Sequence, residues 1–379
     1  MYWYVVMRNW ILGVFISLCL TACADREQLI LGPEAVHVGT PHQIFVATNR
    51  QPKSNAHGYG KSRSFDVAYQ QATVVVPKDH VRGQLSIKHK KPDPQTHFSI
   101  AALHDLKNDT GFENALARHT KGRSLDDRRA MVFVHGFNNS YSEALYRQAQ
   151  MLHDADAFDV QVNFAWPSAA TVVGYGHDRD SALFSRDALV ETLESTRKGT
   201  RAKPFLLAHS MGALLSMEAL RQLDIGQPGW AAKNLFGVAL IVPDIDIDVF
   251  NSQLTKLQSL PQPFLLFVSE RDAALRLSGL ISGRPSRLGN DSDIAALADH
   301  QILVFDISAF GDDRNTDHFA IATSPALLDF ITSGGVQHLL TADTGTSLIL
   351  KAGSKKIAVT KETKGRAILW RLAPIKGPA

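Results

Sequence analysis

The sequence predicts an α/β fold in which a mostly parallel central sheet is flanked by helices. From Arg129 onward, apolar runs of strand length alternate with segments that have helical periodicity. Strands that are apolar along their whole length are typical of parallel sheets, because helices cover both faces of such sheets. The intervening helices supply the crossover connections that parallel strands require. The expected strands are AMVFVHGF, VQVNFAWP, PFLLAHS, FGVALIVPD, PFLLFVSERD and ILVFDISAF.

The composition is typical of a globular protein. The chain has 379 residues, 45% of them hydrophobic and 20% charged, which is enough for one large domain or two ordinary ones. Its formal net charge of +3 comes without clustered basic and interleaved aromatic residues, so no nucleic acid is expected as a partner. The cysteines, Cys19 and Cys23, exclude a disulfide framework or a cysteine zinc site in the folded body. The motif PDIDID lacks the glycine and the final acid of a calcium loop, and no metal or other cofactor is expected.

The amino-terminal segment has the organisation of a secretory signal. Arg8 is its only charged residue before Asp25, and its apolar run Trp10–Leu20 is too short to span a bilayer comfortably. The run is followed by Thr-Ala-Cys and resembles a bacterial lipoprotein signal, in which the cysteine carries the lipid. Residues 1–22 are therefore the expected signal peptide, and Cys23 the expected acceptor of an acyl chain such as palmitate. Ala24 and the following acid favour the outer membrane facing the periplasm; an uncleaved anchor is the alternative.

Three segments are expected after this signal. Residues 23–61 predict a tether that contains one strand, HQIFVATNR. Residues 62–338 predict the main domain, which opens with two further strands, ATVVVP and GQLSI, as an antiparallel amino-terminal part of the sheet. Residues 339–379 are rich in lysine and arginine and predict a solvated extension with one or two strands.

Ser210 stands where the strand PFLLA must turn sharply into the helix MGALLSMEALRQL. The residues two positions to either side, Ala208 and Gly212, are small enough to permit such a turn. This is the placement of the nucleophile elbow of α/β-hydrolases, although the sequence reads AxSxG instead of GxSxG. Ser210 is therefore the expected nucleophile. The alternative is an inert serine at the end of a core strand.

A serine nucleophile needs donors that stabilise the oxyanion formed in the reaction. The strand in MVFVHGFNNSY ends at a His-Gly pair, and a glycine there lets the backbone approach a substrate. The backbone N–H groups of Phe137 and Met211 are the expected oxyanion donors.

The serine also needs a general base. His135 precedes Ser210 and is expected to be structural, because the triad of such hydrolases runs in the order Ser, Asp or Glu, His. Only His300, His318 and His338 follow Ser210 in the chain. His318 is the expected base, because its polar loop directly follows the last expected strand.

Two acids could orient that base. Asp244 and Asp272 each follow an apolar strand, and both keep the Ser, Asp, His order. Asp272 is preferred because it lies in a polar turn directly after its strand. Asp244 is expected to cap the helix that begins near Asp248 or to brace the loop.

Five blocks of the sequence together resemble an uncharacterised bacterial family of esterase/lipase-like α/β-hydrolases, over about Ile44 to Ser333. The resemblance implies the α/β-hydrolase fold and carries the roles of nucleophile, acid and base onto Ser210, Asp272 and His318. It implies no particular substrate. The blocks are FVHGFNNSYSEALYRQAQ, FAWPSAATVVGYGHDRDSALFSRDAL, LLAHSMGALL, VPDIDIDVF and VSERDAALRLS.

These features predict a lipid-anchored serine hydrolase of the bacterial cell envelope, with a small-molecule ester or other acyl compound as substrate. The short connections after Ser210 leave little chain for a lid, which favours small or soluble esters over bulk lipid. A serine peptidase or a thioesterase would use the same residues. A noncatalytic envelope scaffold with this fold is the alternative from another class, since a fold does not imply a function.

Overall fold

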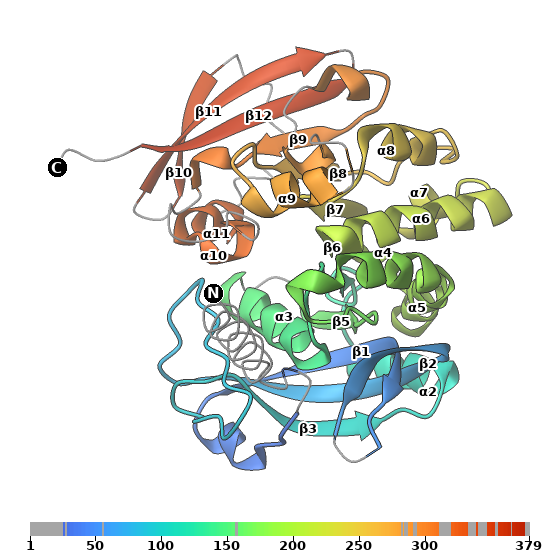
Figure 1. Ribbon diagram of the computed structural model, residues 1–379, viewed down its shortest axis with the longest axis vertical. Helices are drawn as coiled ribbons and strands as arrows, with labels where there is room; N and C mark the ends of the chain where they lie inside the picture. The colour runs from blue at the N-terminus through green and yellow to red at the C-terminus, as the bar shows by residue number, and fades with distance from the viewer. Residues whose placement is uncertain are drawn as a thin grey trace, which may run out of the picture.

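The computed structural model describes residues 26, 29–54, 57–155, 158–281, 283, 287–290, 294–310, 320–332, 339, 347–352, 355–364 and 366–375. Over these residues the chain forms one twelve-stranded sheet with helices on both faces (Figure 1). The strands are β1 (Thr40–Pro52), β2 (Tyr59–Val76), β3 (Ser99–Asp105), β4 (Ala130–Val134), β5 (Val160–Phe164), β6 (Phe205–His209), β7 (Gly237–Ile241), β8 (Phe264–Val268), β9 (Leu303–Asp306), β10 (Ser347–Ala352), β11 (Lys355–Lys364) and β12 (Ala367–Ile375).

The strand order is β10-β11-β12-β9-β8-β7-β6-β4-β5-β1-β2-β3. The neighbouring strands from β12 to β1 in this order are all parallel, whereas β10, β11, β2 and β3 pair in antiparallel fashion at the two edges. The six apolar runs are confirmed as strands β4 to β9. This is an α/β-hydrolase fold with a mostly parallel sheet, as the sequence predicts.

The helices divide between the two faces of the sheet (Figure 1). Helices α2, α4, α5, α6, α7 and α8 pack on one face, and α3, α10 and α11 pack on the other. In β6, Leu206 and Ala208 face the first group, whereas Phe205 and Leu207 face the second. A strand covered on both sides must be apolar along its length. Within the described residues, no helix is both long and apolar enough to cross a bilayer.

The helices have the following bounds. They are α2 (Asp109–His119), α3 (Tyr141–Ala155), α4 (Tyr175–Phe184), α5 (Arg186–Thr200), α6 (Met211–Gly226), α7 (Trp230–Asn234), α8 (Ile247–Leu254), α9 (Ala273–Ile281), α10 (Ala320–Thr323) and α11 (Pro325–Thr332), with 3-10 turns η1 (Pro33–His37), η2 (Val172–Gly174), η3 (Leu288–Asn290), η4 (Ile294–Leu297) and η5 (Ser308–Phe310).

The amino-terminal region differs from the expected tether. β1 pairs in parallel with β5 and antiparallel with β2, so it belongs to the main sheet. The expected strand GQLSI is not a strand; β3 takes that place in the sheet instead. Gly83 has a φ of 83° and lies in a turn, and it packs so tightly against the carbonyl of Thr323 that a Cβ would collide with it. A contact distant in the sequence therefore accompanies the turn found in place of the expected strand.

The carboxyl-terminal region is not the expected solvated appendage. β12 pairs in parallel with β9 and thereby continues the sheet through β11 to β10. Lysine side chains alternate with apolar ones along these strands: Lys356 is exposed, whereas Ile357 and Trp370 are buried. Alternation of this kind gives a strand one solvated face and one core face, so a basic composition does not prevent it from packing.

Candidate active site

Ser210 occupies a strained turn between β6 and α6. Its backbone has φ 53° and ψ −123°, a region that residues other than glycine rarely adopt and that costs about 1–3 kcal/mol. Its N–H donates to the carbonyl of Ile241 at 2.9 Å, and its carbonyl accepts the N–H of Asp244 at 3.2 Å. β6 and α6 meet with Ser210 at their junction, which is the strand–turn–helix geometry of a nucleophile elbow.

Two glycines let the loop after β4 pack directly against this turn. A Cβ on Gly212 would collide with the carbonyl oxygen of His135. A Cβ on Gly136 would lie 2.9 Å from the Cβ of Ser210 and 2.6 Å from Nδ1 of His209. The backbone that follows Gly136 is therefore held beside the nucleophile.

The two predicted oxyanion donors lie on either side of this contact. Met211 is the first residue of α6, so its N–H has no acceptor within the helix. Phe137 directly follows Gly136. Neither N–H has a hydrogen-bond acceptor among the described residues. The assignment of an oxyanion hole stays a prediction, and the close packing at Gly136 is consistent with it.

His135 is held as a neutral packing residue. Burial, followed by the positive charge of Arg50, lowers the pKa of His135 to about 3. Its Nδ1 lies 2.9 Å from the carbonyl of Gly136 and its Nε2 lies 3.1 Å from that of Trp166. The ring stacks on the Trp166 indole at 4.9 Å. Such an imidazole captures no proton at neutral pH, in agreement with the structural role expected for it.

A carboxylate that the sequence reasoning missed joins two loops at this edge. Asp178, in the first turn of α4, is fully buried. It accepts hydrogen bonds from the N–H of Asn138 at 3.1 Å, the N–H of Ala169 at 2.6 Å and the hydroxyl of Ser168 at 2.5 Å. It thus ties the loop after β4, which carries Phe137, to the loop after β5. An acid in the first turn of a helix was the only signal in the sequence, and it names no partner.

Arg26 binds the same loop from outside. Its guanidinium donates to Oδ1 of Asn138 at 2.7 Å, to the carbonyl of Asn138 at 3.0 Å and to the carbonyl of Ala170 at 2.9 Å. It also forms two hydrogen bonds to the carboxylate of Glu143, at 2.9 and 2.7 Å. Asn138 has a φ of 59°, so these contacts hold an unusual backbone conformation next to Phe137.

Asp244 is engaged in a buried ion pair. Its Oδ1 lies 3.2 Å from Nε of Arg287 and accepts the hydroxyl of Ser278 at 2.8 Å. Its Oδ2 accepts the hydroxyl of Tyr175 at 3.0 Å. Both side chains of the ion pair are almost fully buried. Asp244 therefore braces the loop, as one of the two roles expected for it.

The other role expected for Asp244, a helix cap, is wrong. Asp246 caps α8 by accepting the N–H groups of Asp248 at 3.0 Å and Val249 at 3.3 Å. Asp244 lies two positions before this cap residue, and its carboxylate pairs instead with Arg287. The sequence could not distinguish Asp244 from Asp246, because both acids closely precede the same helix.

Asp272 is fully buried just beyond β8. Its Oδ1 accepts the N–H of Leu275 at 2.8 Å and so caps α9. Its own N–H donates to the carbonyl of Ser269 at 3.2 Å. His318 lies outside the described residues, as does Cys23, so the roles of these two residues stay predictions.

A cavity of about 390 Å³ opens at Ser210. Its walls are largely apolar with a few polar groups, which is typical of sites for small organic ligands. Of the predicted site residues, Ser210 and Phe137 line it; Met211 and Asp272 adjoin lining residues in the sequence. The lining residues are Phe137, Asn138, Val172, Tyr175, Ser210, Asp244, Ala273, Ala274, Leu275, Leu277, Ser278 and Ile281.

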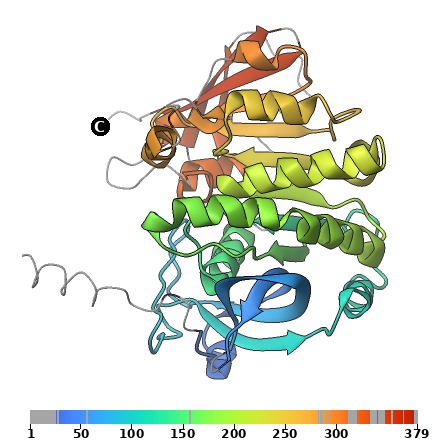
Figure 2. The same ribbon diagram turned by 45° about the vertical axis from the view of Figure 1, so that its right-hand side comes forward.

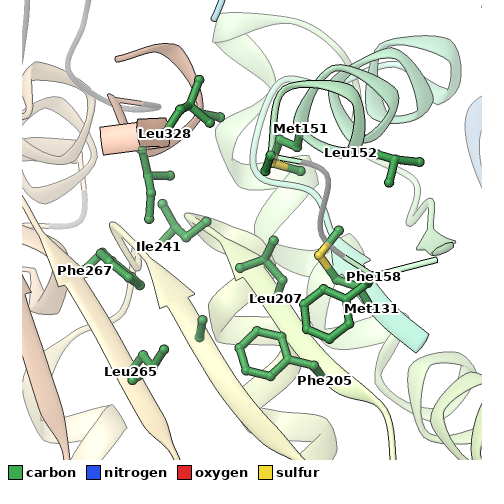
Figure 3. A pocket seen from close by; sticks show the side chains of 14 residues that line it. Met131, Met151, Leu152, Phe158, Phe205, Leu207, Ile241, Leu265, Phe267 and Leu328 are labelled. Carbon is green, nitrogen blue, oxygen red and sulfur yellow. The ribbon is translucent and has the colours of Figure 1, made fainter. Parts of the chain in front are cut away.

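A second cavity, of about 200 Å³, lies between the sheet and the helices α3, α10 and α11 (Figure 3). Its walls are entirely apolar, with side chains such as Met131, Met151, Phe205 and Phe267. A site without nucleophilic or titratable groups cannot perform acyl transfer, so the cavity at Ser210 is the candidate active site. Among the described residues, no group of three His, Cys, Asp or Glu side chains could hold a metal ion.

Several solved structures resemble the chain at low identity. Aspergillus fumigatus lipase B is 13% identical over 41% of this chain, with a TM-score of 0.28, and the chain spans only 39% of that lipase. A putative yden-like hydrolase from Pectobacterium atrosepticum is 18% identical over 54% of this chain and 94% of its own, with a TM-score of 0.29. The peroxisomal alpha-beta-hydrolase Lpx1 from Saccharomyces cerevisiae is 10% identical over 81% of this chain and 92% of its own, with a TM-score of 0.30.

No curated protein sequence matches the chain. A family match covers more than half of it: residues 109–335 match the family described as "Alpha/beta hydrolase of unknown function (DUF900)". The matched residues include β4 to β9 and the Ser210 turn. The chain therefore belongs to this family of α/β-hydrolases.

Proposed function

We propose that the chain is a serine hydrolase that cleaves carboxylic esters through an acyl-enzyme intermediate. The observation that carries the proposal is the strained backbone of Ser210 on the wall of a largely apolar cavity. Strain of this kind persists only where the surrounding structure imposes it, and it is concentrated at functional sites. An inert serine would gain nothing from this conformation.

The reaction follows the general course of serine hydrolases. Oγ of Ser210 attacks the ester carbonyl carbon while His318 takes its proton. The N–H groups of Phe137 and Met211 donate to the resulting oxyanion. Collapse of the tetrahedral intermediate breaks the bond to the alcohol, which leaves with the proton from His318. Water, activated by the same imidazole, then attacks the acyl-enzyme and releases the acid.

We assign the triad acid to Asp272. Asp244 already pairs with the buried guanidinium of Arg287 and accepts the hydroxyls of Ser278 and Tyr175, and diverting it to an imidazole would break this buried network at high cost. Asp272 is buried in a turn defined by its own contacts to Ser269 and Leu275. This environment supports a carboxylate that orients an imidazole.

We further propose that the protein acts in the bacterial envelope, attached through lipid on Cys23. The support is the signal-like segment before Cys23, with its apolar run Trp10–Leu20. The outer membrane facing the periplasm is the proposed location.

Labelling with a fluorophosphonate probe tests the serine chemistry. The probe is expected to label the wild-type chain and a Ser216→Ala control but not Ser210→Ala. Ser216 is a buried serine on the same helix that does not line the cavity. Equal labelling of Ser210→Ala would overturn the assignment, and an unlabelled wild type would favour a noncatalytic scaffold. Matched ester, amide and thioester substrates then separate an esterase from a peptidase or thioesterase.

A further inference from the structure

Exposed aliphatic side chains surround the mouth of the Ser210 cavity. Val173, in η2, is 93% exposed, and Leu280, at the end of α9, is 71% exposed. Val172, Leu277 and Ile281 are exposed and also line the cavity, so the exposed apolar surface continues into the candidate active site. A contiguous exposed apolar patch marks a surface that contacts another apolar phase or partner. This apolar rim consists of Val172, Val173, Leu277, Leu280 and Ile281.

The α9 part of the rim exposes three aliphatic side chains on one side of the helix. Leu277, Leu280 and Ile281 are exposed, whereas Leu275 is buried against the protein. Exposed positions three and four residues apart lie on one side of a helix. Arg276 is exposed on the same helix, and such a side chain can place its charge at lipid headgroups while its stem stays among apolar groups. Figure 2 shows α9 in orange and the first turn of α4 in green at one edge of the molecule.

Arg26, the first described residue, binds at this same edge. Arg26 binds the carbonyls of Asn138 and Ala170; Asn138 lines the cavity, and Ala170 precedes the rim by two residues. Cys23 stands three residues before Arg26 in the sequence, and three residues of chain can span at most about 11 Å. A lipid on Cys23, as proposed above, would therefore be tethered close to the rim.

We infer that the apolar rim rests on the lipid bilayer and that the substrate is a membrane-resident ester whose acyl chain enters the cavity from the bilayer. This inference deepens the proposed esterase function and rests on it for the substrate class. Burial of the rim in the acyl region removes apolar surface from water, and the anchor holds the cavity mouth at the membrane. The expectation of small, soluble esters rested only on the short connections after Ser210, which leave little chain for a lid. The exposed apolar side chains beside the cavity are direct evidence about which surroundings the cavity entrance favours.

The first test measures membrane contact independently of activity. The full-length chain is reconstituted in vesicles of phosphatidylethanolamine and phosphatidylglycerol after labelling of V173C with the fluorophore NBD. The wild-type chain, treated identically, corrects for labelling of Cys19 and Cys23. Doxyl lipids are expected to quench the label at position 173. They should not quench it at L125C, because Leu125 is exposed before β4, at the opposite edge of the sheet.

Equal quenching at both positions, or at neither, would overturn the membrane contact. A label at position 173 that becomes shielded in lipid-free protein as the protein concentration rises would assign the rim to a second copy of the chain. That outcome would likewise overturn the proposal.

The second test measures substrate class. The V173S/L280S variant removes two rim side chains that do not line the cavity, so hydrolysis of soluble p-nitrophenyl butyrate should stay at the wild-type rate. Hydrolysis of p-nitrophenyl palmitate dissolved in the vesicles should fall about tenfold, because burying even one aliphatic side chain contributes the free energy of such a factor. The control L125S/I225S changes two exposed aliphatic residues away from the rim and should keep both rates.

The outcomes separate this inference from the proposed function. An unchanged ratio of the two rates in V173S/L280S would overturn the substrate class while leaving the esterase proposal intact. Absence of hydrolysis of both esters by the wild type would overturn the esterase proposal, and the NBD quenching would still decide the membrane contact.

Discussion

Ser210 adopts a strained backbone conformation at the centre of the candidate active site. A φ of 53° is unfavourable for a residue with a Cβ, yet Ser210 adopts it where it lines the cavity. Hydrogen bonds to Ile241 and from Asp244 hold this turn at both ends. The sheet and α6 thus stabilise a local geometry that an isolated chain would avoid.

Replacing Ser210 separates strain from chemistry. Ser210→Gly and Ser210→Ala should both lose fluorophosphonate labelling, because both lack the hydroxyl. Ser210→Gly should be more stable than Ser210→Ala by about 1 kcal/mol in the free energy of unfolding, because glycine adopts positive φ without steric cost. Urea denaturation of the two variants measures this difference. Equal stabilities would mean that the turn is not strained.

The two acids after β7 and β8 should respond differently to the same substitution. Asp272→Asn should lower kcat on a soluble ester about 10⁴-fold with little change in unfolding, since an amide holds the wrong imidazole tautomer. Asp244→Asn should instead lower the free energy of unfolding by about 3–5 kcal/mol, because it breaks the buried ion pair with Arg287. Kinetics and urea denaturation on both proteins distinguish the roles. A greater loss of kcat in folded Asp244→Asn would transfer the triad role to that residue.

At the scale of elements, the site is a meeting of loops after parallel strands. Asp178 joins the loops after β4 and β5 through its hydrogen bonds to both. Arg26 also donates to backbone carbonyls of both loops, at Asn138 and Ala170. The loops after β6 and β7 meet through the Ser210 carbonyl and Asp244. Carboxyl ends of parallel strands gather at one edge, and buried polar contacts then determine how each loop is oriented there.

Asp178 tests this coupling between loops. Asp178→Asn keeps the side-chain volume but loses the charge that accepts two N–H groups and a hydroxyl. The Phe137 N–H should shift, and kcat on a soluble ester should fall about 10²-fold with little change in KM, because small displacements act on the transition state. Asp187→Asn, at an exposed acid on the next helix, serves as the control. A raised KM with unchanged kcat would assign Asp178 to substrate binding instead.

At the scale of the whole molecule, strands outside the family match complete the sheet at both edges. The match ends at residue 335 and begins at residue 109, so β1 to β3 and β10 to β12 lie beyond it. These outer strands are hydrogen-bonded to the matched part of the sheet, because β1 pairs with β5 and β12 pairs with β9. The molecule therefore folds as one sheet, with no boundary in its hydrogen-bonded ladder.

Substitution of Trp370 tests how much the carboxyl-terminal strands contribute to the free energy of unfolding. Trp370 is almost fully buried in β12, so Trp370→Ala should lower the free energy of unfolding by about 3–5 kcal/mol. Lys356→Ala, on the exposed side of β11, should change it by less than about 0.5 kcal/mol. Both are measured by urea denaturation. A loss at Trp370 as small as that at Lys356 would support the appendage that the basic composition suggested.

Much of the parallel core could be predicted from the sequence alone, and so could the Ser210 elbow. An apolar run such as PFLLA needs cover on both faces, and a serine between Ala208 and Gly212 needs a sharp turn. These are local requirements of composition and sterics. They determine strand positions and the identity of the candidate nucleophile without knowledge of neighbours in space.

Only the tertiary structure decided which partner each charged or apolar residue meets. Asp244 pairs with Arg287, and Arg26 donates to Asn138. These partners are far apart in the sequence, so the local pattern of residues does not predict that they meet. The basic carboxyl-terminal strands pack because their apolar side chains alternate onto the core face beside β9, and the apolar rim gathers from η2 and α9 around one cavity. Long-range contacts of this kind depend on how the sheet brings distant segments together, which the local sequence does not encode.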